Sequence, residues 1–186
     1  MKTEDFLKAP MCEVSHELTS TDLANALEQS HLMFYEGKSE HGGQNRGAWV
    51  DEINKWIGVN VGSPYCLSGI IFNLRKLEPQ FGIKFEIPNF ASTQLFWLSI
   101  PKEHRTDKPG RFCIGIFRSK SDPTRGHAVY CKTGSVDQVF NTFEFNTDIK
   151  GSRDGGGAMS TKRNVAGTPT LDLLGFVDLS KCWKKI

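Results

Sequence analysis

Apolar residues in the first third of the chain recur with the spacing of amphipathic helices. Between residues 21 and 35 they return every three or four positions, which predicts a helix with Thr19 or Ser20 as its N-cap. A second, shorter helix is predicted over residues 49–57, and Gly58 is a suitable residue to end it. A polar loop that contains several glycines separates the two helices.

A third helical pattern starts within the sequence GSPYCLSG. Ser63 is a good N-cap, and Pro64 suits the first helical position because the N–H that proline lacks has no partner there. Apolar residues then follow at helical spacing until Pro79, which predicts that the helix ends by Glu78. Cys66 therefore lies in the first turn, where unpaired N–H groups and the positive end of the helix dipole favour an anion.

The second half of the chain has the pattern of β-strands. After a short helix predicted over residues 92–98, runs of β-branched and aromatic residues alternate with glycine-containing polar turns, the longest of which is DIKGSRDGGG. The predicted strands cover residues 112–117, 127–132, 139–146 and 173–179. Helices followed by short strands predict an α+β fold in which the N-terminal helices pack on an antiparallel β-sheet.

The length and composition fit one domain that covers residues 1–186. We expect an N-terminal extension over residues 1–20, a helical part over residues 21–79 and a β-sheet part over residues 110–180. With 186 residues and 38% hydrophobic content, the chain is long enough to form one hydrophobic core. The net charge of +2 is too small to indicate a nucleic-acid-binding protein.

Several other classes are disfavoured by the motifs present. Five irregularly spaced cysteines argue against a disulfide framework and indicate a reducing compartment. We find no zinc half-site and no calcium-binding loop, so we expect neither a metal nor a cofactor. We also find no signal-peptide pattern and no apolar run of about 18 residues, so we expect synthesis in the cytoplasm without membrane insertion.

Four polar residues form a candidate catalytic set: Cys66, His127, Glu144 and Asn146. A thiol at the start of a helix is shifted toward its thiolate form, and His127 opens a predicted strand. Glu144 and Asn146 are two residues apart on a later strand and should share one face, from which either could accept a hydrogen bond from the imidazole. The set has the order nucleophile, base and orienting residue, and the Cys66 N–H could form part of an oxyanion hole.

These motifs resemble those of the papain-like CHAP and NlpC/P60 cysteine peptidases and amidases, which include many phage endolysins. The resemblance lies in GSPYC at a helix start, GHAVY at a strand start and EFNT on a later strand, followed by a glycine- and arginine-rich loop, GSRDGGGAMSTKR. It covers roughly residues 37–176. One departure is Phe145, which occupies a position that is often glycine in the family.

The resemblance implies a papain-like fold and a role for each matching residue. Cys66 would be the nucleophile, His127 the general base and Glu144 the residue that orients the histidine, with Asn146 as a second polar group. Gln44 precedes the nucleophile, as the oxyanion-hole glutamine does in papain-like enzymes. His41 and Trp97 are weaker candidates for substrate contacts. The substrate would be an amide bond of bacterial peptidoglycan, cleaved either as an N-acetylmuramoyl-L-alanine amidase or as a peptide endopeptidase.

The biological setting implied by the resemblance is that of a phage endolysin that acts on the cell wall. A second interpretation is an amidase effector delivered by a secretion system, which would have an immunity protein as its partner. A third is a catalytically inactive homologue that binds the cell wall or serves a structural role, and a fourth is a cysteine hydrolase of another amide.

The remaining candidates are expected to be structural. Cysteines within predicted strands and tryptophans seven residues apart on one helix face are typical of core residues. The residues expected in the core on these grounds are Cys113, Cys131, Trp49 and Trp56. His16, His31 and His104 are expected at the surface or in loops.

Overall fold

The computed structural model describes residues 17–148 and 156–186. Residues 1–16 of the expected N-terminal extension and residues 149–155 of the expected glycine-rich turn lie outside the described residues. The described elements are α1 (Ser20–Phe34), α2 (Ala48–Ile57), α3 (Cys66–Phe81), β1 (Ile83–Phe85), α4 (Thr93–Ser99), a 3-10 helix (Lys102–His104), β2 (Arg105–Thr106), β3 (Cys113–Ser119), β4 (Gly126–Cys131), β5 (Val139–Thr147), β6 (Gly157–Asn164), β7 (Leu171–Asp178), a second 3-10 helix (Leu179–Lys181) and β8 (Trp183–Lys185).

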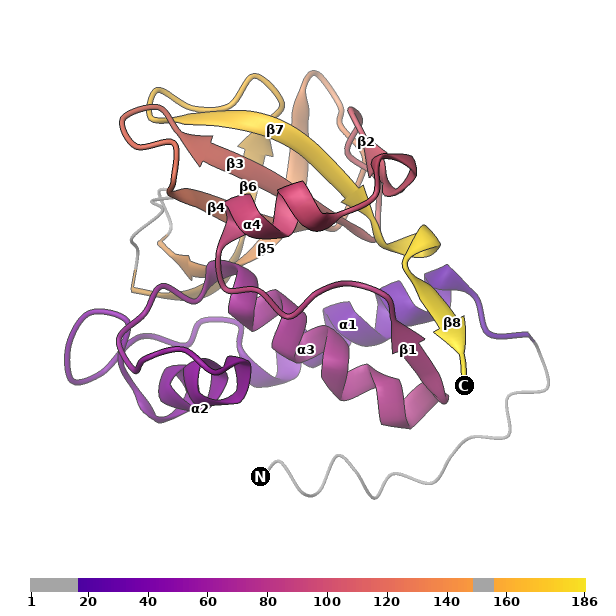
Figure 1. Cartoon of the computed structure of the whole chain (residues 1–186), viewed down its shortest axis with the longest axis horizontal. Helices are drawn as coiled ribbons and strands as arrows, with labels where there is room; N and C mark the ends of the chain where they lie inside the picture. The colour runs from indigo at the N-terminus through magenta and orange to yellow at the C-terminus, as the bar shows by residue number, and fades with distance from the viewer. Residues whose placement is uncertain (1–16, 149–155) are drawn as a thin grey trace.

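Helices α1, α2 and α3 form one layer of the molecule, and a β-sheet forms the other (Figure 1). The sheet is antiparallel, with the strand order β2-β7-β3-β4-β5-β6. The short helix α4 contacts β3 and β4. The predicted α+β class, with the N-terminal helices packed on an antiparallel sheet, is therefore confirmed.

Local sequence explains the ends of the first two helices. The Thr19 hydroxyl accepts a hydrogen bond from the Asp22 N–H (3.3 Å), while the Asp22 carboxylate accepts one from the Thr19 N–H (2.9 Å). This reciprocal capping box starts α1. Helix α2 ends at Gly58, whose φ of 83° lies in the left-handed region that glycine adopts most readily. Both predicted helices are confirmed.

Helix α3 begins two residues later than the sequence predicted. The Ser63 N–H donates to the Asn60 carbonyl (3.1 Å), and the Asn54 side chain of α2 donates to the Ser63 carbonyl (3.0 Å). Because these bonds hold residues 60–63 in a turn, the Ser63 side chain does not cap the helix, and Cys66 is the first helical residue. The Cys66 thiol is therefore on the first residue of α3, at the N-terminus of the helix.

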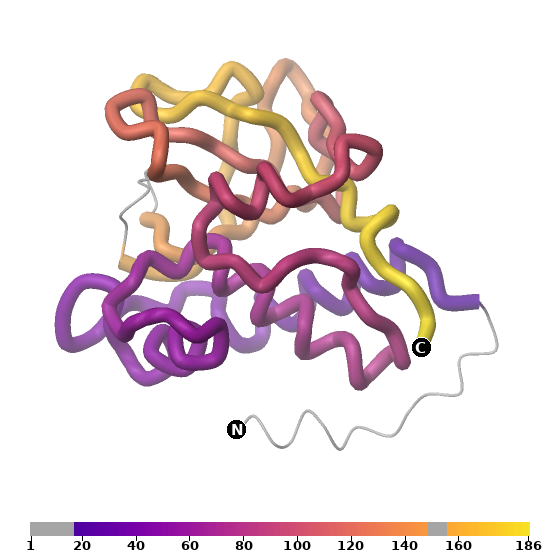
Figure 2. Tube along the Cα trace, in the orientation of Figure 1, coloured from indigo at the N-terminus to yellow at the C-terminus, as the bar shows by residue number. Residues whose placement is uncertain are grey.

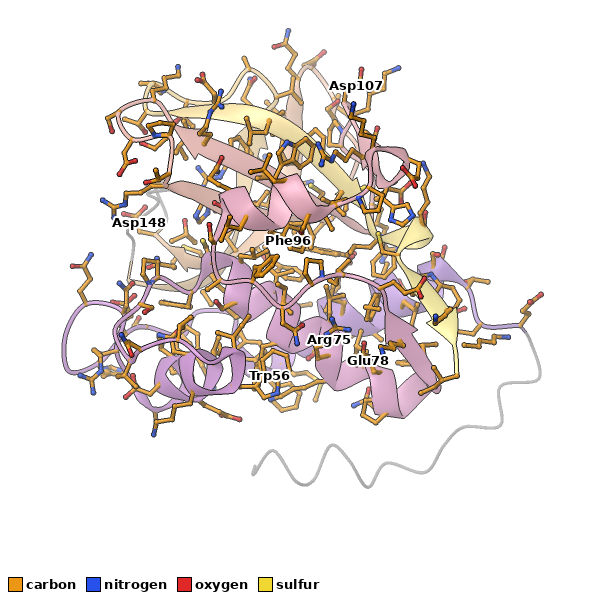
Figure 3. All side chains as sticks on the ribbon, viewed as in Figure 1. Trp56, Arg75, Glu78, Phe96, Asp107 and Asp148 are labelled. Carbon is orange, nitrogen blue, oxygen red and sulfur yellow. The ribbon has the colours of Figure 1, made fainter. Side chains whose placement is uncertain are left out.

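The end of α3 also differs from the prediction, because Pro79 lies inside the helix. A proline in the last turn removes only one donor, and the Gly82 N–H closes the helix on the Glu78 carbonyl. Arg75 pairs with Glu78 (2.5 Å), and both side chains also bond the backbone of the segment that follows α3. Figure 3 labels these two side chains beside β1.

Helix α3 contacts β5 at a glycine. A Cβ atom at Gly69 would lie only 2.4 Å from the ring of Phe145, a separation that real Cβ atoms essentially never show. The missing side chain of Gly69 therefore makes room for the aromatic ring, which is fully buried. The bulky residue next to Glu144 is accommodated by a glycine on the facing helix.

Replacing Gly69 with alanine is expected to destabilise the protein by about 1–3 kcal/mol, because the new methyl group forces either the Phe145 ring or the helix to move. Urea unfolding gives this free energy. The matched control is the double variant Gly69→Ala/Phe145→Leu, in which the smaller side chain relieves the overlap and the two changes couple favourably. Strictly additive effects would show that the two residues do not compete for the same space.

The four predicted strands are confirmed as β3, β4, β5 and β7, but β6 was not predicted. It lies within the segment expected to be a glycine- and arginine-rich loop. Strand β6 is at the edge of the sheet and pairs along β5, from Val139–Asn164 to Thr147–Gly157. An edge strand with one neighbour can carry charged and polar residues, so AMSTKRN lacks the apolar alternation by which a strand is detected.

A second, two-stranded sheet joins distant parts of the sequence. Strand β8 pairs with β1, which directly follows α3, in the register Ile83–Lys185 to Phe85–Trp183. The Trp183 indole also donates to the Ser20 hydroxyl at the start of α1 (3.1 Å). In the trace of Figure 2 the C-terminal segment runs down beside β1, away from the large sheet. This last strand therefore ties α1 and α3 together.

The predictions about core residues have mixed outcomes. Cys113 and Cys131 are buried between β3 and β4, as predicted. Trp56 is 43% exposed, although its ring contacts Phe72 of α3 at 5.3 Å between centroids, so its assignment to the core was wrong. His31 was expected at the surface, but it is buried and its ring stacks on Phe143 of β5 at 4.0 Å. Burial of His31 lowers its pKa to about 4.

Candidate active site

Cys66 lies where β4 and β5 stop pairing. The two strands pair only at Tyr130–Phe143 and Cys131–Thr142, and α3 contacts both of them. The Ala128 N–H, which faces this opening, lies within hydrogen-bonding reach of the Cys66 sulfur, as does the Leu67 N–H. The N-terminus of α3 therefore lies beside β4 and β5 where these strands are no longer paired. The N–H groups of Ala128 and Leu67 point at the Cys66 thiol.

The environment of Cys66 favours the thiolate. Burial alone would raise the pKa of this thiol, because it disfavours the charged form. The hydrogen bond and the positive charge of His127, together with the two backbone N–H groups, outweigh burial, and the pKa is lowered. By contrast, burial raises the pKa of the Cys113 thiol to about 11 and that of Cys182 to about 12. Of these three cysteines, only Cys66 has a lowered thiol pKa and hence the reactive thiolate form.

His127 connects the thiol to a carboxylate. Its Nε2 atom is hydrogen bonded to Glu144 Oε2 at 2.8 Å, and both side chains are fully buried. The other ring nitrogen, Nδ1, is buried without a hydrogen-bond partner of ordinary geometry among the described residues, so it is open to the Cys66 thiol, which raises the pKa of the imidazole. Burial would lower the pKa of His127, but its bonds to Cys66 and Glu144 raise it to about 9. The imidazole is therefore held as an imidazolium.

Glu144 is bound on three sides. Besides His127, it accepts a hydrogen bond from the Thr142 hydroxyl (2.7 Å) and two bonds from Arg163 of β6, one of them from Nε at 2.8 Å. Burial would raise the pKa of Glu144, but the hydrogen bonds and charges of His127 and Arg163 lower it to about 2. Arg163 is itself 5% exposed. The carboxylate is thus anionic at every pH at which the protein is expected to work.

Arg163 was not among the predicted site residues. It lies on the strand β6 that the sequence did not reveal, in the register Phe140–Arg163 across β5. A fully buried glutamate needs cationic or hydrogen-bonding partners, and Arg163 bonds both oxygen atoms of Glu144. The sequence gives no local pattern that selects this arginine from the others nearby.

Asn146 is placed differently from what simple strand alternation predicts. It is the extra residue of a β-bulge between Phe145–Ala158 and Thr147–Gly157, with a left-handed φ of 54°. A bulge re-aims the side chain, so the rule that residues two apart share a face does not apply here. Asn146 lines the same cleft as Cys66, and its Oδ1 is buried with no hydrogen-bond partner among the described residues.

The cleft beside Cys66 has a volume of about 260 Å³. Its walls come from the turn before α3, the start of α4 and the residues just before His127, including Ser63, Thr93 and Arg125. This volume is below the range of about 300–1,000 Å³ for pockets that enclose a whole small molecule. The cleft therefore fits the reacting group of a larger substrate whose remainder lies along the surface.

The other sequence candidates lie away from this cleft. Gln44 and His41 are exposed in the loop before α2, and neither lines the cleft. Trp97 packs against Gly175 of β7 and carries the Arg105 guanidinium over its ring at 4.5 Å. The structure thus brings together Cys66, His127, Glu144 and Asn146, but not these three residues.

In the described residues, no group of three or more His, Cys, Asp or Glu side chains is placed to hold a metal ion. None of the described helices has the length and apolar character needed to cross a bilayer. A scan against protein-family models finds no match, and a search of the curated proteins finds no significantly similar sequence. The geometry of the site and the motifs around it are therefore the basis for a functional proposal.

The lowered thiol pKa leads to an expected pH profile. We expect Cys66 to be alkylated by iodoacetamide with a rate that rises through a pKa below the ordinary value of about 8.5, since His127 and the backbone donors stabilise its thiolate. A second change is expected near pH 9, where His127 loses its proton. The rate in Cys66→Ser, which retains the other cysteines, is subtracted at each pH. A single transition in the alkylation rate near pH 8.5 would contradict a thiolate–imidazolium pair of Cys66 and His127.

Proposed function

We propose that the chain is a cysteine-dependent hydrolase of amide bonds. The observation that carries the proposal is the buried row Cys66, His127 and Glu144, in which the thiol pKa is lowered and the imidazole pKa is raised. A structural cysteine requires neither partner. The same row is typical of papain-like enzymes, in which a helix presents the nucleophile to a histidine on a sheet, and we propose the papain-like fold on this ground.

The proposed reaction proceeds in two steps. The Cys66 thiolate attacks the carbonyl carbon of the amide, and the negative charge that develops on the oxygen is stabilised by the Cys66 N–H at the end of α3. His127 donates its proton to the leaving amine as the C–N bond breaks, which leaves a thioester on Cys66. Water, deprotonated by His127, then attacks the thioester, and the C–S bond breaks to release the acid and restore the Cys66 thiolate beside the His127 imidazolium.

Asn146 is suited to bind the substrate. Asn146 lines the cleft, and its buried Oδ1 has no partner among the described residues, which is costly for such an acceptor. A substrate N–H that enters the cleft would satisfy this acceptor and place the amide beside Cys66. This contact would favour substrates that present a second N–H close to the bond that is cleaved, as a peptide does.

The substrate we propose is bacterial peptidoglycan. The support is the resemblance of GSPYC, GHAVY and EFNT to cell-wall hydrolases of the CHAP and NlpC/P60 type, with these motifs now placed around one cleft. A small cleft on a protein with a net charge of +2 also suits an extended polymer that carries carboxylates. The corresponding role would be that of a phage endolysin that acts as an amidase or as a peptide endopeptidase on the cell wall.

The test is digestion of purified sacculi by the wild-type chain and by Cys66→Ser. New amino groups and soluble fragments, identified by mass spectrometry, are expected with the wild-type chain alone. Fragments with a free N-terminal alanine and intact sugars indicate an amidase, whereas cut peptides indicate an endopeptidase. A parallel casein assay covers a protein substrate. Cleavage of casein without any release from sacculi would overturn the peptidoglycan proposal, and inactivity on both would favour an inactive homologue.

A further inference from the structure

The proposed site contains two buried anions but only one imidazolium between them. Cys66 and His127 form one pair, and Glu144 lies on the far side of the same imidazole. Placing a second negative charge in this buried region is unfavourable unless a second positive charge accompanies it. Arg163 lies on the far side of Glu144 and binds both of its oxygen atoms.

We infer that Arg163 is a fourth member of the site, a positioning residue that balances the charge of Glu144 and fixes its orientation. The alternating order is thiolate, imidazolium, carboxylate and guanidinium. With Arg163 in place, Cys66 can ionise without leaving an excess of negative charge in the buried row. This role rests on the proposed nucleophile and base, but it is independent of which amide is cleaved.

The contacts of Arg163 fit a positioning role better than a simple surface ion pair. The guanidinium is buried, lies over the ring of Phe117 at 5.8 Å and approaches Glu144 with two different nitrogens. A two-point contact of this kind holds a carboxylate in one plane, which a single lysine ammonium does not. Because the Thr142 hydroxyl also bonds Glu144 Oε1, the carboxylate has one orientation toward His127.

The other titratable group that faces Glu144 does not supply the balancing charge. Cys131 of β4 interacts with Glu144, but burial raises the pKa of its thiol well above the ordinary value, so it is neutral. Lys162, the neighbour of Arg163 on β6, is exposed, whereas Arg163 is buried. Of the described residues, the cation that contacts Glu144 opposite His127 is Arg163.

The experiment compares the pH profile of Cys66 alkylation in wild-type protein, Arg163→Gln and Arg163→Lys. Loss of the guanidinium in Arg163→Gln is expected to raise the thiol pKa by about one unit, so that alkylation at any pH below the wild-type thiol pKa is about tenfold slower. Arg163→Lys loses the two-point contact but retains the charge that this measurement reports, so its rate at the same pH is expected to stay within about twofold of wild type. Lys162→Gln is the matched control, because it removes the same charge one residue away and should leave the profile unchanged.

A purely structural role for Arg163 would lower the unfolding temperature of Arg163→Gln but leave its alkylation profile in place, and that result would overturn the inference. If Arg163→Gln does not fold, Arg163→Lys decides: a folded lysine variant that reacts tenfold more slowly would also overturn it. The wild-type profile tests the nucleophile and base of the proposed function separately. A wild-type chain with a lowered thiol pKa but no activity on sacculi would leave the role of Arg163 intact. It would contradict only the proposal that peptidoglycan is the substrate.

Discussion

Replacing Cys66 with serine is expected to lower the rate of amide hydrolysis by about 10⁴-fold or more. The serine hydroxyl keeps its proton at neutral pH, so the environment that stabilises a thiolate at the end of α3 has no anion to stabilise. Release of dye from labelled sacculi, measured over several hours, has the range needed for such a change.

The matched control for this experiment is Cys113→Ser. Cys113 is buried on β3, and burial raises its thiol pKa to about 11, so its removal is expected to leave the rate within about twofold. Near-UV circular dichroism of both variants verifies the fold. If Cys66→Ser retained more than about 1% of the wild-type rate, the nucleophile would have to be another group.

The second large effect concerns stability. Glu144→Leu is expected to destabilise the chain by about 3–5 kcal/mol at pH 7, because it removes a buried carboxylate that pairs with both the Arg163 guanidinium and His127. Urea unfolding measures the loss. In the double variant Glu144→Leu/Arg163→Met, both charges are replaced by apolar groups, and the loss is expected to be smaller than in the single variant.

The control for this change is an ion pair at the surface. Arg111 and Glu28 lie 2.9 Å apart, with the arginine 41% exposed, and Glu28→Gln is expected to cost no more than about 1 kcal/mol. A Glu144→Leu variant that is as stable as Glu28→Gln would mean that the ion pairs of Glu144 with Arg163 and His127 contribute little to stability. The double variant would then show no recovery.

The parts of the fold that follow from local patterns could be predicted. Helical spacing gave α1, α2 and the body of α3, and the capping residues Thr19 and Gly58 fixed two of the ends. The exact start of α3 depends on the turn that Asn54 holds through the Ser63 carbonyl. That contact comes from a neighbouring helix, so no pattern within residues 63–66 could reveal it.

The candidate site was predictable in its members but not in its geometry. Each of Cys66, His127 and Glu144 has a local signal, namely a helix start or a strand with polar residues at its end. Their meeting depends on the opening between β4 and β5, which forms because strand pairing stops after Tyr130–Phe143. Arg163 reaches the site from an edge strand whose sequence is polar, so neither hydrophobic periodicity nor spacing identified it.

The pairing of β8 with β1 has a consequence for the order in which the protein folds during synthesis. Strand β1 directly follows the helix that carries Cys66, but its partner residues, Trp183–Lys185, are made about one hundred residues later. Until they have left the ribosome, α1 and α3 lack the clamp that Trp183 provides through Ser20. Helix α3, which carries Cys66, is therefore synthesised early but gains its contacts with β8 late. The chain reaches its native structure only after the sheet that carries His127 has also been synthesised.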